Sequence, residues 1–283
     1  MCQSKSIIAG ILLYNPDLRR LQQNVDAVKN CVENVLLVDN ASRNFLEIQE
    51  FASRNKITLR HNNVNEGLPK SFNTMIRFAK DEGFGNLLLL DQDSICDANL
   101  VDLYKKNISS KYVCLTPRIV HRLKDYEEQY GLKDKLDEEE IVNESINSGT
   151  LINLTILPQD LRFNERLFVD CVDFDFFLQI KKRGLKALRV NSAKLYCDLG
   201  NLSTHHFIGR KCFANNYSVF RLEKQAKDRV LFILANFKEP IARKVLKLSL
   251  LGYLMIILFE KQKISKLFAV SKGFVKGLIA LFH

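Results

Sequence analysis

Residues 86–93 read NLLLLDQD, an unbroken run of four leucines that ends in two aspartates separated by one residue. A strand that reads as a continuous apolar run is buried on both faces, which is typical of a parallel sheet covered by helices. The same order, an apolar run followed by an amphipathic stretch, begins at residues 6–14, 34–40 and 57–62. This alternation predicts an α/β fold with an open, mainly parallel, doubly wound sheet.

Composition excludes several other classes of protein. With 283 residues, 47% of them hydrophobic, the chain can bury a large core and is not a disordered protein. The seven cysteines lack CxxC or CxxH spacing, which argues against a zinc site and favours reduced thiols in a cytosolic protein. The apolar run at 6–14 lacks a basic region before it and a cleavage site after it, so it predicts a first strand and not a signal peptide.

The net charge of +10 is concentrated at the end of the chain. Residues 221–283 hold thirteen Lys/Arg and four Asp/Glu, so the preceding residues are nearly neutral. Residues 245–260 are strongly apolar but too short in their uninterrupted part to cross a bilayer, and 263–278 mix lysines with apolar residues at helical spacing. This pattern predicts a basic amphipathic helix on an anionic membrane surface; a helix packed on the core or on a second subunit is the alternative. Nucleic-acid binding is not expected, because the segment has no clustered arginines and no known module.

Carboxylates follow two of the predicted strands at the point where a ligand is expected. Ligands of open α/β sheets bind at the carboxyl ends of the strands, and Asp39 and Asp91 end the second and fourth strands. Asp91 and Asp93 can both face a cleft there, and Mg²⁺ is typically held by one or two carboxylates together with substrate phosphates. The alternative is that Asp93 caps the next helix and Asp91 is a solvated strand end.

Seven segments, in order along nearly the whole chain, carry a family resemblance. They are Tyr14-Asn15-Pro16, Val38-Asp39-Asn40-Ala41-Ser42, Asn65-Glu66-Gly67 with Asn73, LLLLDQDS (87–94), INSGTLIN (146–153), LFVDCVDFDFFLQIKKRG (167–184) and the basic, apolar tail (263–278). With these segments the chain resembles family 2 inverting glycosyltransferases of the GT-A type, most closely their bacterial rhamnosyltransferase-like branch. The resemblance implies a catalytic, nucleotide-sugar-binding domain over residues 1–210 and a helical membrane-associating region over 211–283.

The resemblance also implies which residues bind the donor nucleotide and its metal. The base would lie against Tyr14, Asn15 and Pro16, and the other residues expected to bind the nucleotide are Asn65, Gly67 and Asp91. Asp39 would accept a hydrogen bond from the pyrimidine N3–H. The alternative is a plain turn at the strand end, because the sequence DNAS (39–42) also favours a turn. Asp91 would face the ribose or the metal, and Asp93 would bind Mg²⁺ or Mn²⁺ directly.

A second carboxylate cluster lies in FVDCVDFDFF. An inverting transfer needs a base that takes the proton of the acceptor hydroxyl, and a carboxylate among phenylalanines can have its pKa raised by desolvation. In the family pattern the base begins the helix after this run, which is the position of Asp173. Asp170, a loop acid, and Asp175, an acid favoured by the helix dipole, are the alternatives, and both are expected in the donor and acceptor pocket.

Two further parts of the expected site carry less specific signals. Ser148 and Gly149 precede a strand that lines the donor and acceptor pocket in the family, with the glycine allowing a close approach of backbone to ligand. Many relatives carry a histidine after the base as a metal or diphosphate ligand, and here Cys197 stands in its place. Asp198 or the pair His205 and His206 could take that role instead. Residues 121–140 are charged and without a clean period, and are expected to form a mobile loop or insertion.

Together these features predict a metal-dependent inverting glycosyltransferase on the inner face of the plasma membrane. The leading donor is dTDP-L-rhamnose, and the expected acceptor is a polyprenol-linked saccharide of O-antigen or capsule synthesis. A UDP-sugar transferase of the same fold and an inactive nucleotide-sugar-binding scaffold remain alternatives, and a homodimer through the C-terminal helices is possible. A nucleotidyltransferase is disfavoured, because the first strand is followed by LLYNPDL and not by a basic, glycine-rich phosphate loop.

Overall fold

A computed structural model describes residues 6–130, 137–198, 200–207 and 209–281. By their contacts these residues form two compact units, Met1–Phe163 with Phe176–Asp198, and Asn164–Asp175 with Leu199–His283. The domain boundary expected near residue 210 stays a prediction.

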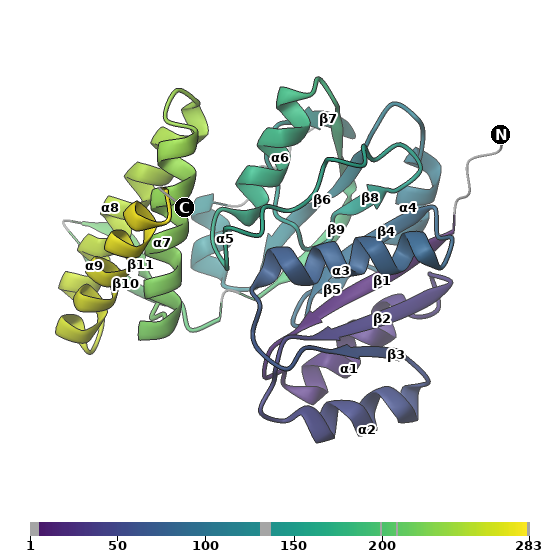
Figure 1. Cartoon of the computed structure of the whole chain (residues 1–283), viewed down its shortest axis with the longest axis horizontal. Helices are drawn as coiled ribbons and strands as arrows, with labels where there is room; N and C mark the ends of the chain where they lie inside the picture. The colour runs from purple at the N-terminus through teal and green to yellow at the C-terminus, as the bar shows by residue number, and fades with distance from the viewer. Residues whose placement is uncertain (1–5, 131–136, 199, 208, 282–283) are drawn as a thin grey trace. The chain divides into compact units, whose positions relative to one another are not determined.

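The first unit is built around one mixed sheet with the strand order β3-β2-β1-β4-β8-β6-β9-β5, and β7 pairs with β9 (Figure 1). Strands β3, β2, β1 and β4 run parallel, as do β6 and β9, whereas β8, β5 and β7 are antiparallel to their neighbours. The strands are β1 Ile7–Leu13, β2 Asn34–Asp39, β3 Thr58–His61, β4 Asn86–Asp91, β5 Ile95–Cys96, β6 Cys114–His121, β7 Glu139–Val142, β8 Leu151–Asn153 and β9 Ala187–Cys197. The predicted mainly parallel α/β sheet is therefore confirmed.

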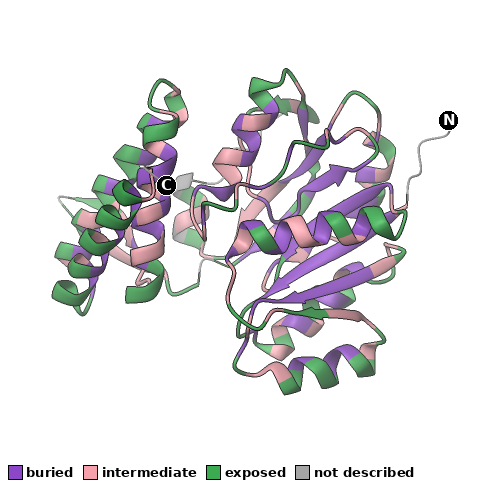
Figure 2. Cartoon of the chain, viewed as in Figure 1, coloured by how far each residue is buried: buried purple, intermediate pink, exposed green. Residues whose placement is uncertain are grey.

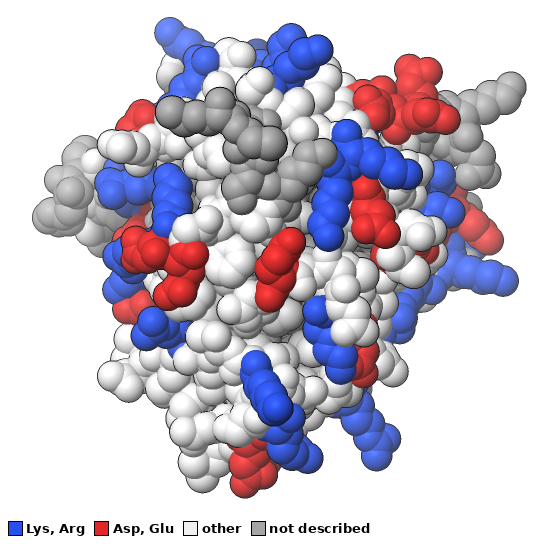
Figure 3. Space-filling view, turned by 90° about the vertical axis from the view of Figure 1, so that its right-hand side faces the viewer, with Lys and Arg blue, Asp and Glu red and all other residues white. Residues whose placement is uncertain are grey.

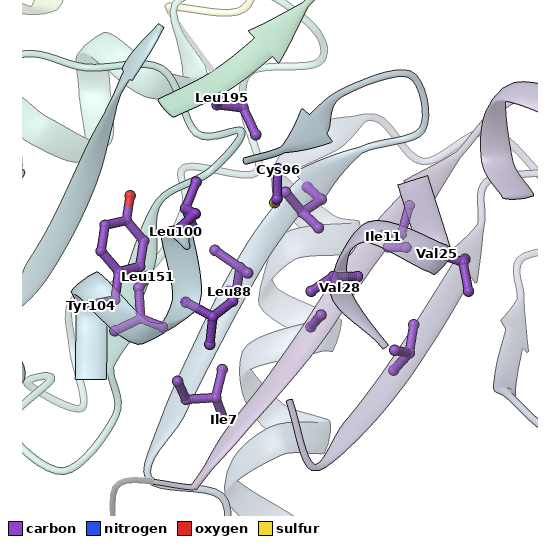
Figure 4. Packing of buried hydrophobic residues seen from close by; sticks show 14 of the residues in the cluster. Ile7, Ile11, Val25, Val28, Leu88, Cys96, Leu100, Tyr104, Leu151 and Leu195 are labelled. Atoms are coloured by element: carbon purple, nitrogen blue, oxygen red, sulfur yellow. The ribbon is translucent and has the colours of Figure 1, made fainter. Parts of the chain in front are cut away.

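Helices cover both faces of this sheet, as its apolar strands require. They are α1 Leu18–Val28, α2 Phe45–Asn55, α3 Leu68–Asp81, α4 Leu100–Asn107, α5 Lys124–Tyr130 and α6 Val172–Lys182. On one face, Ile7 and Ile11 of β1 pack with Val25 of α1 and Tyr104 of α4 in a fully buried cluster (Figure 4). On the other face a Cβ added to Gly10 would lie 2.7 Å from the sulfur of Met75, so α3 lies directly on β1. The central strands are accordingly buried along most of their length (Figure 2).

One predicted loop is partly regular structure. Residues 124–130 form α5, and β7 extends the sheet edge by pairing with β9. The expectation of a loop over 121–140 is therefore wrong for residues 124–130 and 139–140, and an insertion stays a prediction. Residues 131–136 lie outside the described chain. Two acids of this region are engaged by the protein: Glu127 accepts the backbone N–H of His121 at 2.7 Å, and Glu140 pairs with Arg189 at 2.5 Å.

The second unit is a hairpin and three helices: β10 Ser203–Phe207, β11 Arg210–Ala214, α7 Val219–Ala235, α8 Pro240–Phe259 and α9 Lys263–Ile279. Helix α9 approaches α7 through glycines, since a Cβ on Gly273 would lie 2.1 Å from the carbonyl oxygen of Glu223. Lys272 and Lys276 of α9 both pair with the Glu223 carboxylate, at 3.1 and 2.6 Å. None of the helices in the described ranges combines the length and apolar composition needed to cross a membrane.

Candidate functional site

The loops that follow β1, β2 and β4 are tied to one another by side chains. The backbone N–H of Tyr14 donates to Oε1 of Gln92 at 2.7 Å, and Nε2 of Gln92 donates back to the Tyr14 carbonyl at 3.3 Å. The backbone N–H of Asn15, a residue with φ of 50°, donates to Oγ of Ser42 at 2.7 Å. Asn44 donates to the carbonyl of Pro16 at 3.1 Å. The three residues expected at the nucleotide base thus lie at the same sheet edge as the DQD segment.

Asp39, the last residue of β2, is fully buried, and only one of its two carboxylate oxygens has hydrogen-bond partners. Its Oδ2 accepts the backbone N–H of Ser42 at 3.2 Å and lies 2.8 Å from Nδ1 of His61. The His61 ring lies against Phe45, with ring centroids 3.8 Å apart. Oδ1 of Asp39 is buried without a hydrogen-bond partner. An unpaired buried acceptor is costly, so this oxygen has capacity for one more donor.

An amide cluster orders the turn before α3. Nδ2 of Asn40 donates to Oδ1 of Asn65 at 2.9 Å, and Oδ1 of Asn40 accepts the backbone N–H of Glu66 at 2.9 Å. Oδ1 of Asn65 also accepts the N–H of Gly67 at 3.0 Å. Gly67 has φ of 83°, a conformation that favours glycine, and it begins α3. Asn65 and Gly67 are therefore held beside the loop that follows Asp39.

The DQD segment is fixed by its backbone. The N–H of Asp91 donates to Oγ of Ser148 at 3.0 Å, and its carbonyl accepts Nδ2 of Asn24 at 2.6 Å. The carbonyl of Asp93 accepts two hydrogen bonds from the guanidinium of Arg20, at 2.9 and 2.7 Å. These contacts involve only main-chain atoms of Asp91 and Asp93. They fix the backbone that carries the two carboxylates.

Arg20 links this segment to the end of β9. Its guanidinium lies 3.0 Å from the carboxylate of Asp198, which also pairs with Arg122 at 3.7 Å. Cys197 is buried, and its thiol lies 3.7 Å from Oγ of Ser94. Burial raises the pKa of Cys197 to about 12, against the lowering effect of its hydrogen bond with Ser94. Of these two candidate ligands, Asp198 offers a carboxylate and Cys197 a protonated thiol.

Ser148 and Gly149 are buried in the turn that precedes β8. Oγ of Ser148 donates to Oγ of Ser94 at 2.8 Å and accepts the backbone N–H of Asp91. This hydroxyl therefore connects the turn before β8 to the DQD segment. Gly149 has φ of 78°, and an added Cβ would lie 2.6 Å from Cγ of Pro117 and 2.9 Å from Cδ2 of Leu195. Packing alone therefore requires glycine at this position, and its predicted role in ligand approach stays a prediction.

Three acidic candidates lie in the second unit or at its edge. Asp170 pairs with Arg229 at 3.3 Å and accepts Nε2 of Gln225. Asp173 and Asp175 are both in the first turn of α6, as the sequence predicts. Oδ1 of Asp173 accepts the backbone N–H of Phe174 at 2.9 Å. Asp173 thus stands at the helix start, whereas Asp170 is engaged by α7.

The paired histidines are part of the β10–β11 hairpin. His205 lies 2.8 Å from Oγ of Ser203 through Nε2, and its ring stacks on Phe259 with centroids 4.5 Å apart. His206 is exposed and faces Lys211 across the hairpin. A role for either as a diphosphate or metal ligand stays a prediction.

Sequence reasoning missed Arg20, Asn24 and His61. Arg20 and Asn24 bind backbone atoms about 70 positions away, so neither has a local motif. Only Asn24 could have been noticed in the sequence, because it is a polar residue on the apolar face that Leu21, Val25 and Val28 form in α1.

The described residues offer a divalent cation two neighbouring carboxylates. Within the described ranges no three His, Cys, Asp or Glu side chains are grouped to hold a metal. Asp91 and Asp93 supply two hard carboxylates, the donor set that Mg²⁺ uses when a substrate phosphate completes its coordination.

Comparison with known proteins agrees with this architecture. The chain is 26% identical over 216 residues to the dTDP-rhamnosyl transferase RfbF of Shigella flexneri, covering 71% of each chain. Its fold is similar to that of GalNAc-T7 with UDP, GalNAc and Mn²⁺ (TM-score 0.58, 14% identity), covering 82% of this chain and 48% of that one. It thus spans about half the length of that structural relative. S. aureus TarS 1–349 has a TM-score of 0.53 at 14% identity, covering 97% of this chain and 72% of that one.

The family model that describes glycosyl transferase family 2 matches residues 9–166, more than half of the 283-residue chain. These residues include β1 to β4, the loops that surround Asp39 and the DQD segment. The chain therefore belongs to glycosyl transferase family 2, and it is a glycosyltransferase with the α/β fold of its GT-A neighbours.

Proposed function

We propose that the protein transfers a sugar from a pyrimidine nucleoside diphosphate to an acceptor hydroxyl, with inversion at the anomeric carbon. The observation that carries this proposal is the unpaired, buried Oδ1 of Asp39. Thymine and uracil present an N3–H donor that matches this acceptor, and Tyr14 and Asn15 lie on the adjoining loop. Rhamnose from dTDP-rhamnose is the leading donor, supported by the similarity to a dTDP-rhamnosyl transferase. UDP-sugars are the second candidate, because uracil has the same N3–H.

Asp91 and Asp93 are the proposed ligands of Mg²⁺ or Mn²⁺. When bound, the cation would supply positive charge that stabilises the departing diphosphate. Arg20 holds the main chain of Asp93 and also pairs with Asp198, so we favour Asp198 over Cys197 as a further contact of this part of the site.

Asp173 is the proposed general base, with Asp170 as the alternative. It accepts the proton of the acceptor hydroxyl while that oxygen forms a bond to the anomeric carbon. The bond from the anomeric carbon to the diphosphate oxygen breaks, and the nucleoside diphosphate leaves. What supports Asp173 over Asp170 is its position in the first turn of α6, which it shares with Asp175. Asp170 is already neutralised by Arg229.

The proposed acceptor is a polyprenol-linked saccharide of O-antigen or capsule synthesis, at the cytoplasmic face of the plasma membrane. Helix α9 supports this because its glycines face α7, while its large apolar side chains are exposed. Those exposed side chains are Ile264, Phe268, Phe274, Val275, Leu278 and Ile279. An apolar stripe flanked by lysines is typical of a helix that lies in the headgroup region of an anionic bilayer. A homodimer through the same surface is the competing proposal.

Nucleotide binding tests the assignment of Asp39. Replacing Asp39 with Asn puts an amide N–H beside the base, so affinity for dTDP and UDP should fall roughly 10- to 100-fold. Affinity for CDP should not fall, because N3 of cytosine is an acceptor. Isothermal titration calorimetry measures all three, and Asp26→Asn, an exposed carboxylate on α1, is the matched control. Unchanged dTDP and UDP affinity in Asp39→Asn would rule out this mode of base recognition.

Transfer itself is tested with a panel of dTDP- and UDP-sugars, with Mn²⁺ and with excess EDTA. Activity with one donor that EDTA abolishes and Mn²⁺ restores is the expected result. Full activity in EDTA would contradict the metal part alone. Tight nucleotide binding without transfer to any acceptor or to water would favour an inactive scaffold.

A further inference from the structure

A buried carboxylate of α7 binds the backbone of the segment that leads into α6. Asp228 is fully buried, and its Oδ2 accepts three successive backbone N–H groups, from Phe168, Val169 and Asp170. The three N···O distances are 2.9, 2.7 and 3.0 Å. Successive N–H groups that converge on one point form an anion-binding concavity, and here α7 supplies the anion.

A second contact from α7 fixes the same segment by its side chain. The carboxylate of Asp170 pairs with the guanidinium of Arg229 at 3.3 Å and accepts Nε2 of Gln225. Burial by itself lowers the pKa of Arg229, but the charge and hydrogen bonds of Asp170 raise it above its usual value. Arg229 also donates to Oγ of Ser249 at 3.2 Å, which anchors the guanidinium to α8.

The residue after this clamped segment is held in an unfavourable conformation. Cys171 has φ of 59°, in the left-handed region that a non-glycine residue rarely adopts. Its thiol donates to Oδ1 of Asp170 at 3.2 Å, and α6 begins at the next residue. Such a turn persists only when the surrounding contacts impose it, and Asp228 and Arg229 make those contacts.

We propose that Asp228, supported by Arg229 acting through Asp170, is a positioning residue that sets the placement of Asp173 for proton transfer. The inference rests on the proposed role of Asp173 as the base. Only Cys171 and Val172 separate the clamped backbone from Asp173, so a shift at 168–170 is passed directly to the first turn of α6. A displacement of about 1 Å of a reacting group can cost about 100-fold in rate.

Stability alone is a poor explanation for this carboxylate. Its second oxygen, Oδ1, is buried without a partner. Burial raises the pKa of Asp228 to about 6, although the three backbone hydrogen bonds lower it. A buried charge of this kind is commonly less stabilising than a well-packed apolar side chain, whereas three charge-assisted hydrogen bonds give a defined backbone geometry.

The test is a double-mutant cycle in the full chain between Asp228→Leu and Asp173→Asn. Asp228→Leu should lower kcat roughly 10- to 100-fold and leave the KM for the donor and the Kd for the nucleotide unchanged. Asp228→Asn keeps an oxygen on the three N–H groups, so it should restore kcat to within tenfold of the parent. In the Asp173→Asn background, Asp228→Leu should change the remaining rate by less than threefold, because both substitutions remove the same proton-transfer step. Glu223→Gln, a carboxylate of α7 that faces α9, is the control and should keep the parent kcat.

Each other outcome contradicts part of the argument. The positioning role would be overturned if Asp228→Leu kept half of the parent kcat. It would also be overturned if the fold-losses of Asp228→Leu and Asp173→Asn multiplied fully in the double variant. If Asp228→Leu does not fold, the same cycle is run with Arg229→Lys, and effects of Arg229→Lys and Asp173→Asn that combine as independent factors again overturn the positioning role. A fully active Asp173→Asn variant would remove the base assignment and this inference with it. Loss of transfer in Asp173→Asn without an effect of Asp228→Leu or Arg229→Lys would remove only the inference.

Discussion

Two buried aspartates are each satisfied on one oxygen only. Asp39 uses Oδ2 for Ser42 and His61, and Asp228 uses Oδ2 for three backbone N–H groups. In both, Oδ1 is buried without a partner. A carboxylate that is buried and incompletely paired costs free energy of folding, so its position is better explained by what it binds or holds. For Asp39 we propose a nucleobase, and for Asp228 the segment before α6.

The raised pKa of Asp228 predicts a specific dependence of stability on pH. The folded-state pKa of about 6 exceeds the unfolded value of 3.8, so the folded protein binds the proton more tightly. The favourable contribution is complete below the unfolded pKa and is lost as pH rises through about 6. Between pH 4 and pH 7 the free energy of unfolding should therefore fall by about 2 kcal/mol relative to Asp228→Asn.

Urea unfolding of the parent and of Asp228→Asn at a series of pH values measures this difference directly. Titratable groups that do not interact with Asp228 cancel in the comparison. A difference that stays constant from pH 4 to pH 7 would mean that Asp228 titrates normally in the folded protein.

The sequence predicted which residues end the strands, but it missed contacts between residues far apart in the chain. Asp39 and Asp91 end apolar runs, and the structure has them at the ends of β2 and β4. In the sequence Asp228 is only one of the few acids in a basic segment. Its partners are main-chain N–H groups 58 to 60 positions away, and main-chain atoms leave no signature in side-chain patterns.

At the scale of elements, the predicted amphipathic helix at 263–278 exists as α9, with small residues on its packed face. The buried residues are Lys266, Ala269, Gly273 and Gly277, and Lys266 is paired with Glu260 at 2.5 Å. The helical spacing of the apolar residues predicted a helix, but it could not say which face of that helix meets α7. The short elements α5 and β7 were missed because four to seven residues are too few for a periodic signal.

The close contact of α9 with α7 predicts opposite effects for the same substitution at two glycines. Alanine gains up to about 1 kcal/mol over glycine in a helix interior. At Gly252 of α8 nothing lies within 4 Å of an added Cβ, so Gly252→Ala should stabilise the protein by about this amount. At Gly273 the Cβ would lie 2.1 Å from a backbone oxygen of α7, and overpacking of about 1–3 kcal/mol outweighs the gain.

Thermal unfolding, with amide exchange in α7 and α9, measures both variants. Gly273→Ala should unfold at lower temperature and lose protection at 219–235 and 263–279, while Gly252→Ala should do neither. Equal stabilisation by both alanines would show that α9 is not packed on α7 through its glycines.

At the scale of the whole molecule, charge and exposed apolar surface are unevenly distributed along the chain. The excess of positive charge lies in residues 221–283, which form α7, α8 and α9. On the face drawn in Figure 3 basic and acidic side chains are interspersed, without a field of one sign. The exposed large hydrophobic residues, by contrast, are concentrated in α8 and α9. A basic segment that also exposes apolar side chains has the composition of a membrane-binding surface.

This distribution predicts binding to anionic lipid vesicles with two separable components. Each lysine near an anionic surface contributes roughly 1 kcal/mol, which salt screens, while burial of apolar side chains is insensitive to salt. Co-sedimentation of the full chain should require anionic lipid and should weaken, without disappearing, as salt rises. Ile264→Ser with Phe268→Ser removes two side chains that are 86% and 72% exposed and should lower vesicle affinity roughly tenfold or more. Leu46→Ser, a 73% exposed leucine on α2, is the matched control and should bind like the parent. If the parent ignores anionic vesicles and sediments as a dimer that Ile264→Ser with Phe268→Ser converts to a monomer, α9 is a subunit interface and the membrane proposal is wrong.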